Sequence, residues 1–448
     1  MFLILNIKNG SQINGSWLWE SAFVNCLAAF LLLVSAVSAH AGSNAREFPE
    51  ELISAISVAI EKHPGVLTAD SQMMSAKSQV SAGEYRWYPK AEVSVRTGER
   101  GDRYSTIGIN QTLWDNGKLN ADYAVAKAGE SAALAAKYTA MQSIGMAAAT
   151  AYFEVARARE QREVAEENIN EHKKLHASVI KRSDGGIGSK SDVTLTTSRL
   201  QQARAAAKQW QGEVDRAEAA YLSVVGLAPG STSLPLFDMW KVSLSKDGFS
   251  ERVIARAPSM QKLREDVKAA ESTVVSKRAE LFPTLFARVD NTKYFGSSPF
   301  DSDTRFSVNF QWQNDVALTQ RFQVEAAQYA VSAAQHALES EERQLLQAAS
   351  NYWADYTTAL SRSEELEKFS VSAAETVLLF KRQFTIGRRS WPEVTNTLQD
   401  LYTAQSQKVD AKYAAMTSRV RLAFVGGEFD YLLNGDMQIK DDFVKQGP

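Results

Sequence analysis

The sequence predicts an α+β membrane protein in which each chain is an internal duplication, and three observations support this fold class. Prolines are scarce: the chain has 448 residues and 10 prolines, with none between Pro89 and Pro229 or between Pro299 and Pro392. Long proline-free tracts rich in Ala, Gln, Glu, Lys and Arg favour very long helices. Short segments of alternating apolar and polar residues, typical of strands, lie outside these tracts. The whole arrangement then occurs a second time in the same order.

The first segment, residues 1–41, is expected to be a signal peptide. Residues 27–39, "LAAFLLLVSAVSA", are too short to span a bilayer comfortably, and Ala39-His40-Ala41 follows as a small-x-small cleavage pattern. An uncleaved anchor helix is the alternative. Cys26, the single cysteine, precedes the apolar run, whereas a lipoprotein signal places its cysteine after that run. We therefore expect a mature chain that begins near Gly42 and has neither disulfides nor a lipid anchor.

Six collinear matches divide the rest of the chain into a first repeat, residues 42–247, and a second repeat, residues 248–432, followed by a tail, 433–448. One such match could be chance, but six in the same order indicate a duplicated unit. The offsets between matched positions lie between 194 and 200 residues; the matches are Pro64 with Pro258, Tyr88-Pro89 with Phe282-Pro283, Trp114 with Trp312, Tyr152-Phe153 with Tyr352-Trp353, Ile187-Gly188 with Ile386-Gly387, and Val225-Gly226 with Val425-Gly426.

Each repeat has the same predicted plan. A helix interrupted near a proline comes first, at about 48–85 and 248–280, and two strands follow, at about 89–113 and 284–313. A long helical hairpin then turns at 184–191 in the first repeat and at 385–392 in the second. The helix from about Gly117 to Ser183 would be on the order of 100 Å long at 1.5 Å per residue. Such a rod must pack along other rods, and its many alanines allow close, coiled-coil-like packing.

The strand signal is clearest in "TRFSVNFQW". Its apolar side chains alternate with Arg, Ser, Asn and Gln, and they would all lie on one face of a strand: Phe306, Val308, Phe310 and Trp312. Three weaker segments repeat the pattern, with apolar faces made by Ala91, Val93 and Val95, by Ile107, Ile109 and Leu113, and by Leu285, Ala287 and Val289.

Strands of about ten residues can cross a bilayer when tilted, and a membrane barrel around water needs apolar residues outside and polar residues inside. Four strands cannot close such a barrel, because even small barrels need about eight. Three copies would supply twelve, so the pattern predicts a homotrimer whose four strands per chain face lipid. The alternative is a pair of soluble hairpins at the end of a helical body.

These features together resemble the TolC family of outer-membrane channel proteins, which serve multidrug efflux and type I protein secretion. The resemblance covers residues 48–432 and rests on the duplicated plan, the strand pairs and two turn-plus-helix signatures. The first begins "GGIGSKSDVTLTTSRLQQA" and the second "FTIGRRSWPEVTNTLQDLYTAQ". The second is the more specific, with a glycine, an acid-Val pair and then Leu-Tyr-x-Ala-Gln along a helix.

The resemblance implies a trimeric conduit in the outer membrane of a Gram-negative bacterium. A 12-stranded barrel in the lipid would continue into a 12-helix α-barrel through the periplasm. The implied partners are a periplasmic adaptor (membrane fusion) protein and, through it, an inner-membrane ABC or RND transporter. Such a protein is not an enzyme and needs no cofactor, and the formal net charge of −2 gives no footprint for nucleic acid.

The glycine cluster "SDGGIGSKSDV" is expected to turn the chain rather than to bind a nucleotide. A phosphate-binding loop needs a preceding strand and a second glycine five residues before Gly-Lys, and this cluster has neither. The glycines can instead adopt the positive φ that ends a helix, and Ser191 and Asp192 can cap the next one. The resemblance places these turns at the periplasmic tip: Gly185, Gly186, Gly188 and Gly387.

The resemblance also implies a latch that closes this tip. Asp192, next to Ser191, would pair with Arg389 near the other turn, and Arg–carboxylate pairs are directional. Relatives place an aromatic hydroxyl three residues before the second glycine, where this chain has Phe384. Glu393 matches an acid that lines the gate, and Asn396 replaces a second one. The alternative for Glu393 is a solvated helix N-terminus.

We expect a passive channel of type I protein secretion, possibly for a large adhesin. Many relatives that serve drug pumps are lipoproteins, whereas this chain is expected to have no lipid anchor. Multidrug efflux is the alternative within the family, and a periplasmic coiled-coil scaffold or adaptor is the alternative of another class. His172 and His176 lie one helical turn apart and could share a metal, but no third ligand is evident and two lysines lie between them. We therefore expect no metal site.

Overall fold

The computed structural model describes residues 49–97, 103–230, 245–295, 302–312 and 319–427. The predicted signal peptide with Cys26 and the predicted tail, 433–448, lie outside the described residues. The described helices and strands fall within one compact unit that begins at Glu51, apart from the first residue of α2.

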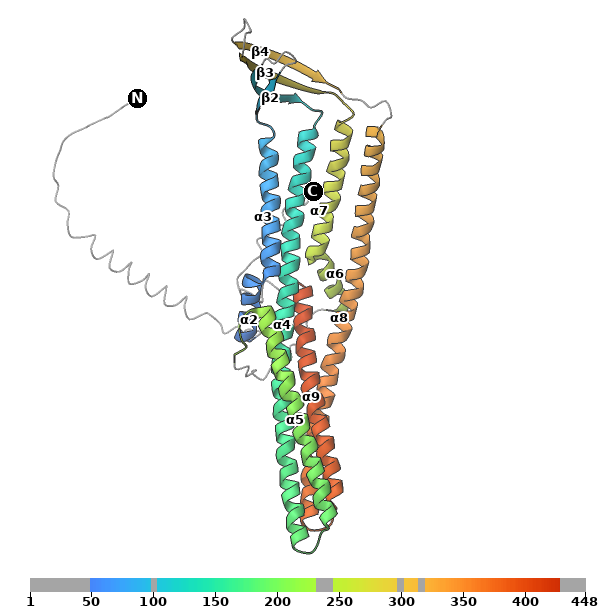
Figure 1. Cartoon of the computed structure of the whole chain (residues 1–448). Helices are drawn as coiled ribbons and strands as arrows, with labels where there is room; N and C mark the ends of the chain where they lie inside the picture. The colour runs from blue at the N-terminus through green and yellow to red at the C-terminus, as the bar shows by residue number, and fades with distance from the viewer. Residues whose placement is uncertain (1–48, 98–102, 231–244, 296–301, 313–318, 428–448) are drawn as a thin grey trace, which may run out of the picture. The chain divides into compact units, whose positions relative to one another are not determined.

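The two halves of the chain repeat one order of elements (Figure 1). The third helix of each half has 67 residues, and the second has 22. The first half contains α2 (Glu50–Lys62), α3 (Pro64–Tyr85), β1 (Lys90–Thr97), β2 (Arg103–Trp114), α4 (Lys118–Asp184) and α5 (Lys190–Val225). The second half contains α6 (Lys246–Arg256), α7 (Pro258–Ala279), β3 (Thr284–Phe295), β4 (Ser302–Gln311), α8 (Thr319–Thr385) and α9 (Trp391–Val425).

The prolines and caps explain where helices restart. Pro64 and Pro258 each stand in the first turn of a 22-residue helix, where a missing N–H costs nothing. After β2, the carboxylate of Asp115 accepts hydrogen bonds from the backbone N–H groups of Gly117 and Leu119 at 3.1 and 2.7 Å. These bonds satisfy two of the free donors at the start of α4, and the 67-residue helix begins directly after a three-residue connection from β2.

The long helices lie side by side in two layers that follow each other along the helix axes, one next to the strands and one next to the turns (Figure 1). Near the strands their contacts run in the order α3, α4, α7, α8. Near the turns, the order is α5, α4, α9, α8. Helices α4 and α8 pass through both layers, so they hold the strand end and the turn end of this unit together. In the part of the chain that the structure describes, no helix is both long enough and apolar enough to span a membrane.

The α4–α9 contact combines small residues with polar groups that form hydrogen bonds between the two helices. Many of the buried side chains are alanines, which let the helices approach closely. Gln161 is fully buried, and its amide donates to the carbonyl of Ser406 at 2.8 Å and to Asp410 at 2.9 Å. Arg157 also donates to Asp410, at 3.0 Å. Buried polar groups need such partners, so this contact specifies which helices pair.

The four strands form one antiparallel sheet in the order β1-β2-β3-β4. The register aligns one apolar row across all four strands, at Ala91, Ile109, Val289 and Phe306. The next predicted residues of β4 continue it, because Val308 lies opposite Ala287 and Phe310 lies opposite Leu285. Phe306 and Phe310 are each 68% exposed, so this apolar face is uncovered in a single chain.

A bulge interrupts the pairing of β2. The register shifts between Thr112 and Trp114, so Trp114 lies opposite Leu285 and Leu113 has no cross-strand partner in this register. An extra residue in one strand breaks the alternation on which the prediction rested. Trp312 follows the end of β4, and its indole donates to the carbonyl of Leu281 at 3.3 Å.

The opposite face of the sheet is polar and internally bonded. Arg288 donates to Asp290 at 2.8 Å and lies 3.5 Å from Glu92 on β1. Gly108 lies opposite Asp290, whose carboxylate occupies the space that a side chain at Gly108 would need. The sheet therefore has one apolar and one charged face, as the alternation predicts.

Candidate functional site

The two hairpins end in turns with the same backbone. Gly186 and Gly387 adopt φ values of 76° and 78°, a region that favours glycine. Each glycine N–H donates to the carbonyl three residues earlier at 3.0 Å, and the next N–H donates to the carbonyl five residues earlier at 2.9 Å. This is the Schellman pattern, which satisfies the last carbonyls of a helix.

This geometry changes the predicted match between the turns. Gly186, not Gly188, is the backbone equivalent of Gly387, so the match of Ile187-Gly188 with Ile386-Gly387 is wrong by two positions. Gly185 has φ −79°, which any residue can adopt. A Cβ on Gly188 would lie 3.3 Å from the backbone nitrogen of Ser183, so that glycine permits a close approach of the chain.

The helices that follow the turns also begin alike. Ser189 is the N-cap of α5: its hydroxyl accepts from the N–H of Asp192 at 3.2 Å, and the Asp192 carboxylate accepts from the N–H of Ser189 at 3.1 Å. Ser191 is not the cap, and its hydroxyl bonds that of Ser189 at 2.7 Å. At the second turn, Glu393 accepts from the N–H and hydroxyl of Ser390 at 2.9 and 2.8 Å. Asp192 and Glu393 are therefore equivalent capping acids.

Arg389 is held within its own turn. Its guanidinium donates to Glu393 at 2.5 Å and to Gln383 at 3.0 Å, and lies 4.4 Å from the ring centre of Phe380. The backbone of Ser390, then Arg389 and the Ser390 hydroxyl, lower the pKa of Glu393 to about 2. Among the described contacts Arg389 therefore meets Glu393 rather than Asp192, and any pairing with Asp192 would have to replace this one.

Asp192 has a different set of partners. The backbone of Ser189 lowers its pKa most, and a hydrogen bond from the side chain of Trp391 lowers it further. Trp391 is the first residue of α9, so the second turn contributes to the electrostatic environment of this acid. This arrangement leaves the carboxylate ionised and fixed in place.

Phe384 is a core residue at this end of the chain. It is buried, and the guanidinium carbon of Arg182, near the end of α4, lies 4.8 Å from its ring centre. Arg182 also donates to the carbonyl of Phe384 at 3.2 Å. Arg182 and Trp391 were not expected at the site. The position of Arg182 in the last turn of α4 could have indicated that it bonds backbone carbonyls, because basic side chains often do so there. It could not have indicated that the carbonyl belongs to the other hairpin.

An apolar cluster joins both hairpins beside the turns. Its buried members come from α4, α8 and α9, and one residue of α5, Val193, packs against it. The buried side chains are Leu175, Val179, Val377, Phe384, Val394 and Leu398, with Val193, Phe380, Trp391 and Leu401 around them. Burying these apolar side chains between them stabilises the packing of the two hairpins of one chain against each other.

The two histidines of α4 have bonding partners of their own. Burial, and then Arg199, lowers the pKa of His172, and His176 bonds the hydroxyl of Thr196 at 2.9 Å. Across the ranges the structure describes, no group of three or more His, Cys, Asp or Glu residues could hold a metal ion.

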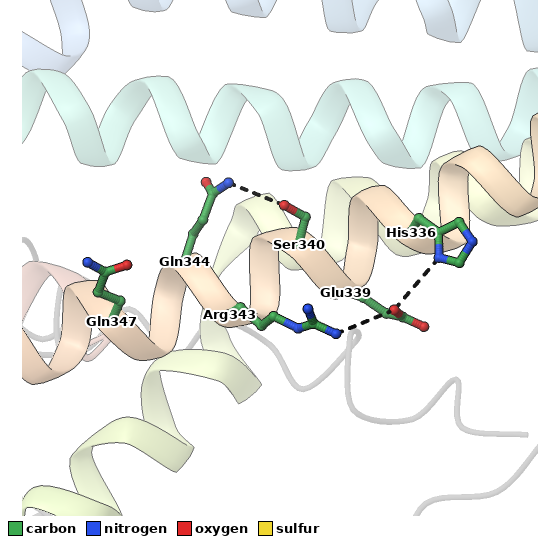
Figure 2. Close-up of a pocket in the computed structure, with 6 residues that line it drawn as sticks. All are labelled: His336, Glu339, Ser340, Arg343, Gln344 and Gln347. Atoms are coloured by element: carbon green, nitrogen blue, oxygen red, sulfur yellow. Dashed lines mark hydrogen bonds and ion pairs between the residues drawn. The ribbon is translucent and has the colours of Figure 1, made fainter.

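A shallow hollow on α8 contains only side chains of that one helix. Figure 2 shows them along one face, with contacts of 3.7 Å from His336 to Glu339 and 3.9 Å from Arg343 to Glu339. All six residues are polar and come from a single stripe: His336, Glu339, Ser340, Arg343, Gln344 and Gln347. With no second element to enclose a ligand, the hollow marks an uncovered helix face rather than a binding site.

Comparison with known proteins gives one family and one fold. The family described as "Outer membrane efflux protein" matches residues 55–227 and 249–428. Protein CyaE of Bordetella pertussis (strain Tohama I) is 23% identical over 253 residues, which are 52% of this chain and 52% of that protein. The chain thus spans about half the length of this curated relative.

Three solved structures illustrate the similarity in fold. CusC has a TM-score of 0.74 at 17% identity, covering 84% of this chain and 92% of CusC. The CmeC outer membrane channel of Campylobacter jejuni has a TM-score of 0.74 at 15% identity, covering 84% and 86%. The open state of the MtrE outer membrane channel of Neisseria gonorrhoeae has a TM-score of 0.72 at 17% identity, covering 84% and 89%. At these identities the likeness concerns the fold alone.

Proposed function

The chain belongs to the outer membrane efflux protein family, and from this premise we propose that three copies form a passive channel through the outer membrane and periplasm of a Gram-negative bacterium. The twelve strands would close a barrel in the lipid, and twelve long helices would continue it as a tunnel. Each chain would supply two structural repeats, residues 42–247 and 248–432.

The observation that carries this proposal concerns the outer elements of the sheet and of the two sets of long helices. In each of them, one outer element comes from the first half of the chain and the other from the second half. In the described residues the sheet ends at β1 and β4, and the helical layers end at α3 and α8 near the strands and at α5 and α8 near the turns. Open sheet edges invite pairing with another chain. A head-to-tail contact of β4 with β1, and of α8 with α3 and α5 of the next copy, would cover all these edges and could close a ring.

The edge helices carry side chains suited to such a contact. Leu67 and Met74 on α3 are half-exposed and seven residues apart. Phe322 and Tyr329 on α8 are more exposed and also seven residues apart. Seven residues farther along α8 comes His336, in the stripe of Figure 2. Rows with a seven-residue spacing are typical of helices that pack along each other.

The sheet supports the membrane part of the proposal. Its exposed apolar face, with Phe306, Val308 and Phe310 on β4, would face lipid, and Trp312 would lie at the rim. Its charged face, with Arg288 and Asp290, would line water. Strands of 8 to 12 residues with this alternation are typical of a membrane barrel and so support the proposal.

The turns would form the periplasmic gate. In a ring, Asp192 of one chain would compete for Arg389 of a neighbouring chain with the Glu393 of that neighbour. The Asp192–Arg389 pair, with Ser191 beside it, would hold the tip closed. Glu393 would face the passage whenever Arg389 leaves it, and three such acids in a narrow opening attract cations. A periplasmic adaptor, joined to an inner-membrane ABC or RND transporter, would open this tip.

For the cargo we favour protein exported by type I secretion, possibly a large adhesin, with small-molecule efflux as the alternative. The match in sequence to Protein CyaE, 23% identical over 253 residues, supports protein secretion, and the description of the matching family as outer membrane efflux proteins supports the alternative. Co-expression with a type I transporter and adaptor, or with a drug pump and adaptor, separates the two by which cargo leaves the cell.

The test of the architecture is the state of the purified full chain. We expect it in the outer-membrane fraction, extracted only by detergent, with a native mass of three chains. A monomer recovered without detergent would contradict the channel and favour the periplasmic scaffold. Deleting the apolar face with Phe306→Ser and Phe310→Ser should shift the protein to the soluble fraction, and Arg305→Gln with Ser307→Ala is the matched control on the polar face.

A further inference from the structure

The apolar face of the sheet changes character along the strands. On β3 the side chains of this face are, from the helix end outward, Leu285, Ala287, Val289, Asn291, Lys293 and Phe295. Their neighbours on β2 change in the same way, from Ile109 to Ser105 and Arg103. This face is therefore apolar next to the helices and polar next to the connections between the strands.

The polar rows begin at the depth where the hydrocarbon of a membrane would end. Trp312 marks the helix end of the sheet, and its neighbour Gln311 pairs with Thr284, nine residues before Lys293. At about 3.3 Å per residue and a tilt of about 40°, nine residues cover a depth of about 23 Å. The apolar band of an outer-membrane barrel is about 25 Å tall. With Trp312 at one boundary of this band, Lys293 lies at the other.

The polar end of this face carries two cations. Arg103 and Lys293 are both exposed and lie on neighbouring strands, because Arg103 pairs with Phe295 and Ser105 pairs with Lys293. Diagonal neighbours of this kind have Cα atoms about 7–8 Å apart. The acids of the described strands all lie on the opposite face: Glu92, Asp290 and Asp303. Charge on the strands is therefore purely positive on the apolar face.

Both cations are left without a carboxylate in the part of the chain that the structure describes. The described ion pairs of the sheet lie on the opposite face, where Arg288 and Arg305 meet carboxylates. Arg103 and Lys293 take part in none of them. The ammonium of Lys293 instead lies 5.9 Å from the ring centre of Phe295. A contact with an aromatic ring positions an ammonium but leaves its charge available.

The place of these cations in the sheet determines what can meet them. β2 and β3 are the inner strands, and each is already paired on both sides. In the proposed ring only β1 and β4 would meet a neighbouring chain, so Arg103 and Lys293 would still face the membrane. Beside them Asn291 donates to the hydroxyl of Thr304 at 2.7 Å. Amide and hydroxyl groups suit contact with polar headgroups rather than with acyl chains.

We infer that Arg103 and Lys293 form a binding surface for the phosphate groups of lipid headgroups in the outer leaflet. The helices leave the sheet at its other end, so these rows would face the outside of the cell. A phosphate accepts charge-assisted hydrogen bonds from a guanidinium and an ammonium together. An aromatic ring such as Phe295 is typical of headgroup level. This inference rests on the proposed function, because it takes the sheet to be part of a barrel in the outer membrane.

The first test measures lipid binding to the purified full chain in detergent by native mass spectrometry. The probe is bis-phosphorylated lipid A, and the comparison lipid is the same lipid A after removal of its phosphates with hydrofluoric acid. We expect the unmodified protein to bind the phosphorylated lipid more tightly. Arg103→Gln with Lys293→Gln should weaken that binding about tenfold or more, because two charged contacts are lost.

The matched control removes the same number of charges from the opposite face of the sheet. Arg96→Gln with Arg305→Gln changes two exposed cations of that face and should bind the phosphorylated lipid as the unmodified protein does. Equal affinity of the two double variants for this lipid would overturn the inference. Equal binding of both lipids by the unmodified protein would overturn it as well.

A second measurement leaves both cations in place and tests the depth of their row. Spin labels are attached at Ser105→Cys or Ile109→Cys, which share one face of β2, with Cys26→Ser to leave no other thiol. The labelled protein is placed in vesicles of phosphatidylethanolamine and phosphatidylglycerol. We expect dissolved oxygen to relax the label at Ile109→Cys more strongly, and a water-soluble nickel chelate to relax the label at Ser105→Cys more strongly.

The two ways in which this measurement can fail are distinct. If oxygen dominates at both positions, the polar row lies among acyl chains and the inference is overturned while the barrel stands. If the nickel chelate dominates at both positions, the sheet does not lie in a membrane, and the proposed function is contradicted together with the inference.

Discussion

The first and second turns have one backbone but hold their acids in different ways. Each has a glycine at φ near 77° and an acid three residues after a serine cap. At the second turn Arg389 is bonded to Glu393, whereas the hydrogen bonds described for Asp192 at the first turn are those with its own cap, Ser189. The difference teaches that the glycine and the N-cap determine the backbone of the turn. The partners of the two acids are not fixed by that backbone, so they can change when a gate opens or closes.

The largest expected effect concerns the core beside the second turn. Phe384→Ala removes a buried ring of the apolar cluster and the surface under Arg182, and should destabilise the protein by about 3–5 kcal/mol. Its equivalent at the first turn, Ser183, packs no such ring, so Ser183→Ala should have little effect. The two are compared by thermal unfolding of the purified protein, and equal losses would remove the asymmetry between the turns.

A smaller and symmetrical effect is expected at the turn glycines. Gly186→Ala and Gly387→Ala each force a side chain into the left-handed region and should each cost about 1–2 kcal/mol. Gly212→Ala, at a helix position where a Cβ would meet only the end of the Arg216 side chain at 3.9 Å, should instead be neutral or stabilising and serves as the control. Unequal losses at the two turns, measured by the same unfolding assay, would show that their backbones are not equivalent.

The smallest expected effect is a pH dependence that belongs to the second turn. The pKa of Glu393 is depressed from its ordinary value near 4.5 to about 2, so its stabilisation is complete above pH 4.5 and is lost as the pH falls through 2. Glu393→Gln should therefore lower the thermal midpoint at pH 5 but not at pH 2. A constant difference between the two proteins across this range would show that the carboxylate is not the stabilising group.

Much of the fold follows from local sequence, and the exceptions have specific causes. Proline-free tracts predict helices such as α4 (Lys118–Asp184) closely, because propensity accumulates over many residues. The bulge at Leu113 was not predicted, because an extra residue in one strand is not visible as a sequence pattern. Gly188 was taken as the equivalent of Gly387 because three of the four residues 185–188 are glycines. The sequence alone does not show which of the three adopts the positive φ.

The site was predictable only where its contacts are local. The turns and their capping acids could be read from glycine, serine and acid spacing, and the Arg389–Glu393 pair has the i,i+4 spacing that helices favour. The contact of Arg182 with Phe384 joins segments about 200 residues apart. No local pattern encodes such contacts, because they depend on how the two hairpins pack.

Single-channel conductance in planar bilayers tests the central claim, that three chains enclose a passage closed at these turns. If Arg389 holds the tip shut, Arg389→Ala should conduct more than the unmodified channel, and Asp192→Ala should do the same. Variants that conduct no more than the unmodified protein, or a purified protein that forms no channels, would contradict the account.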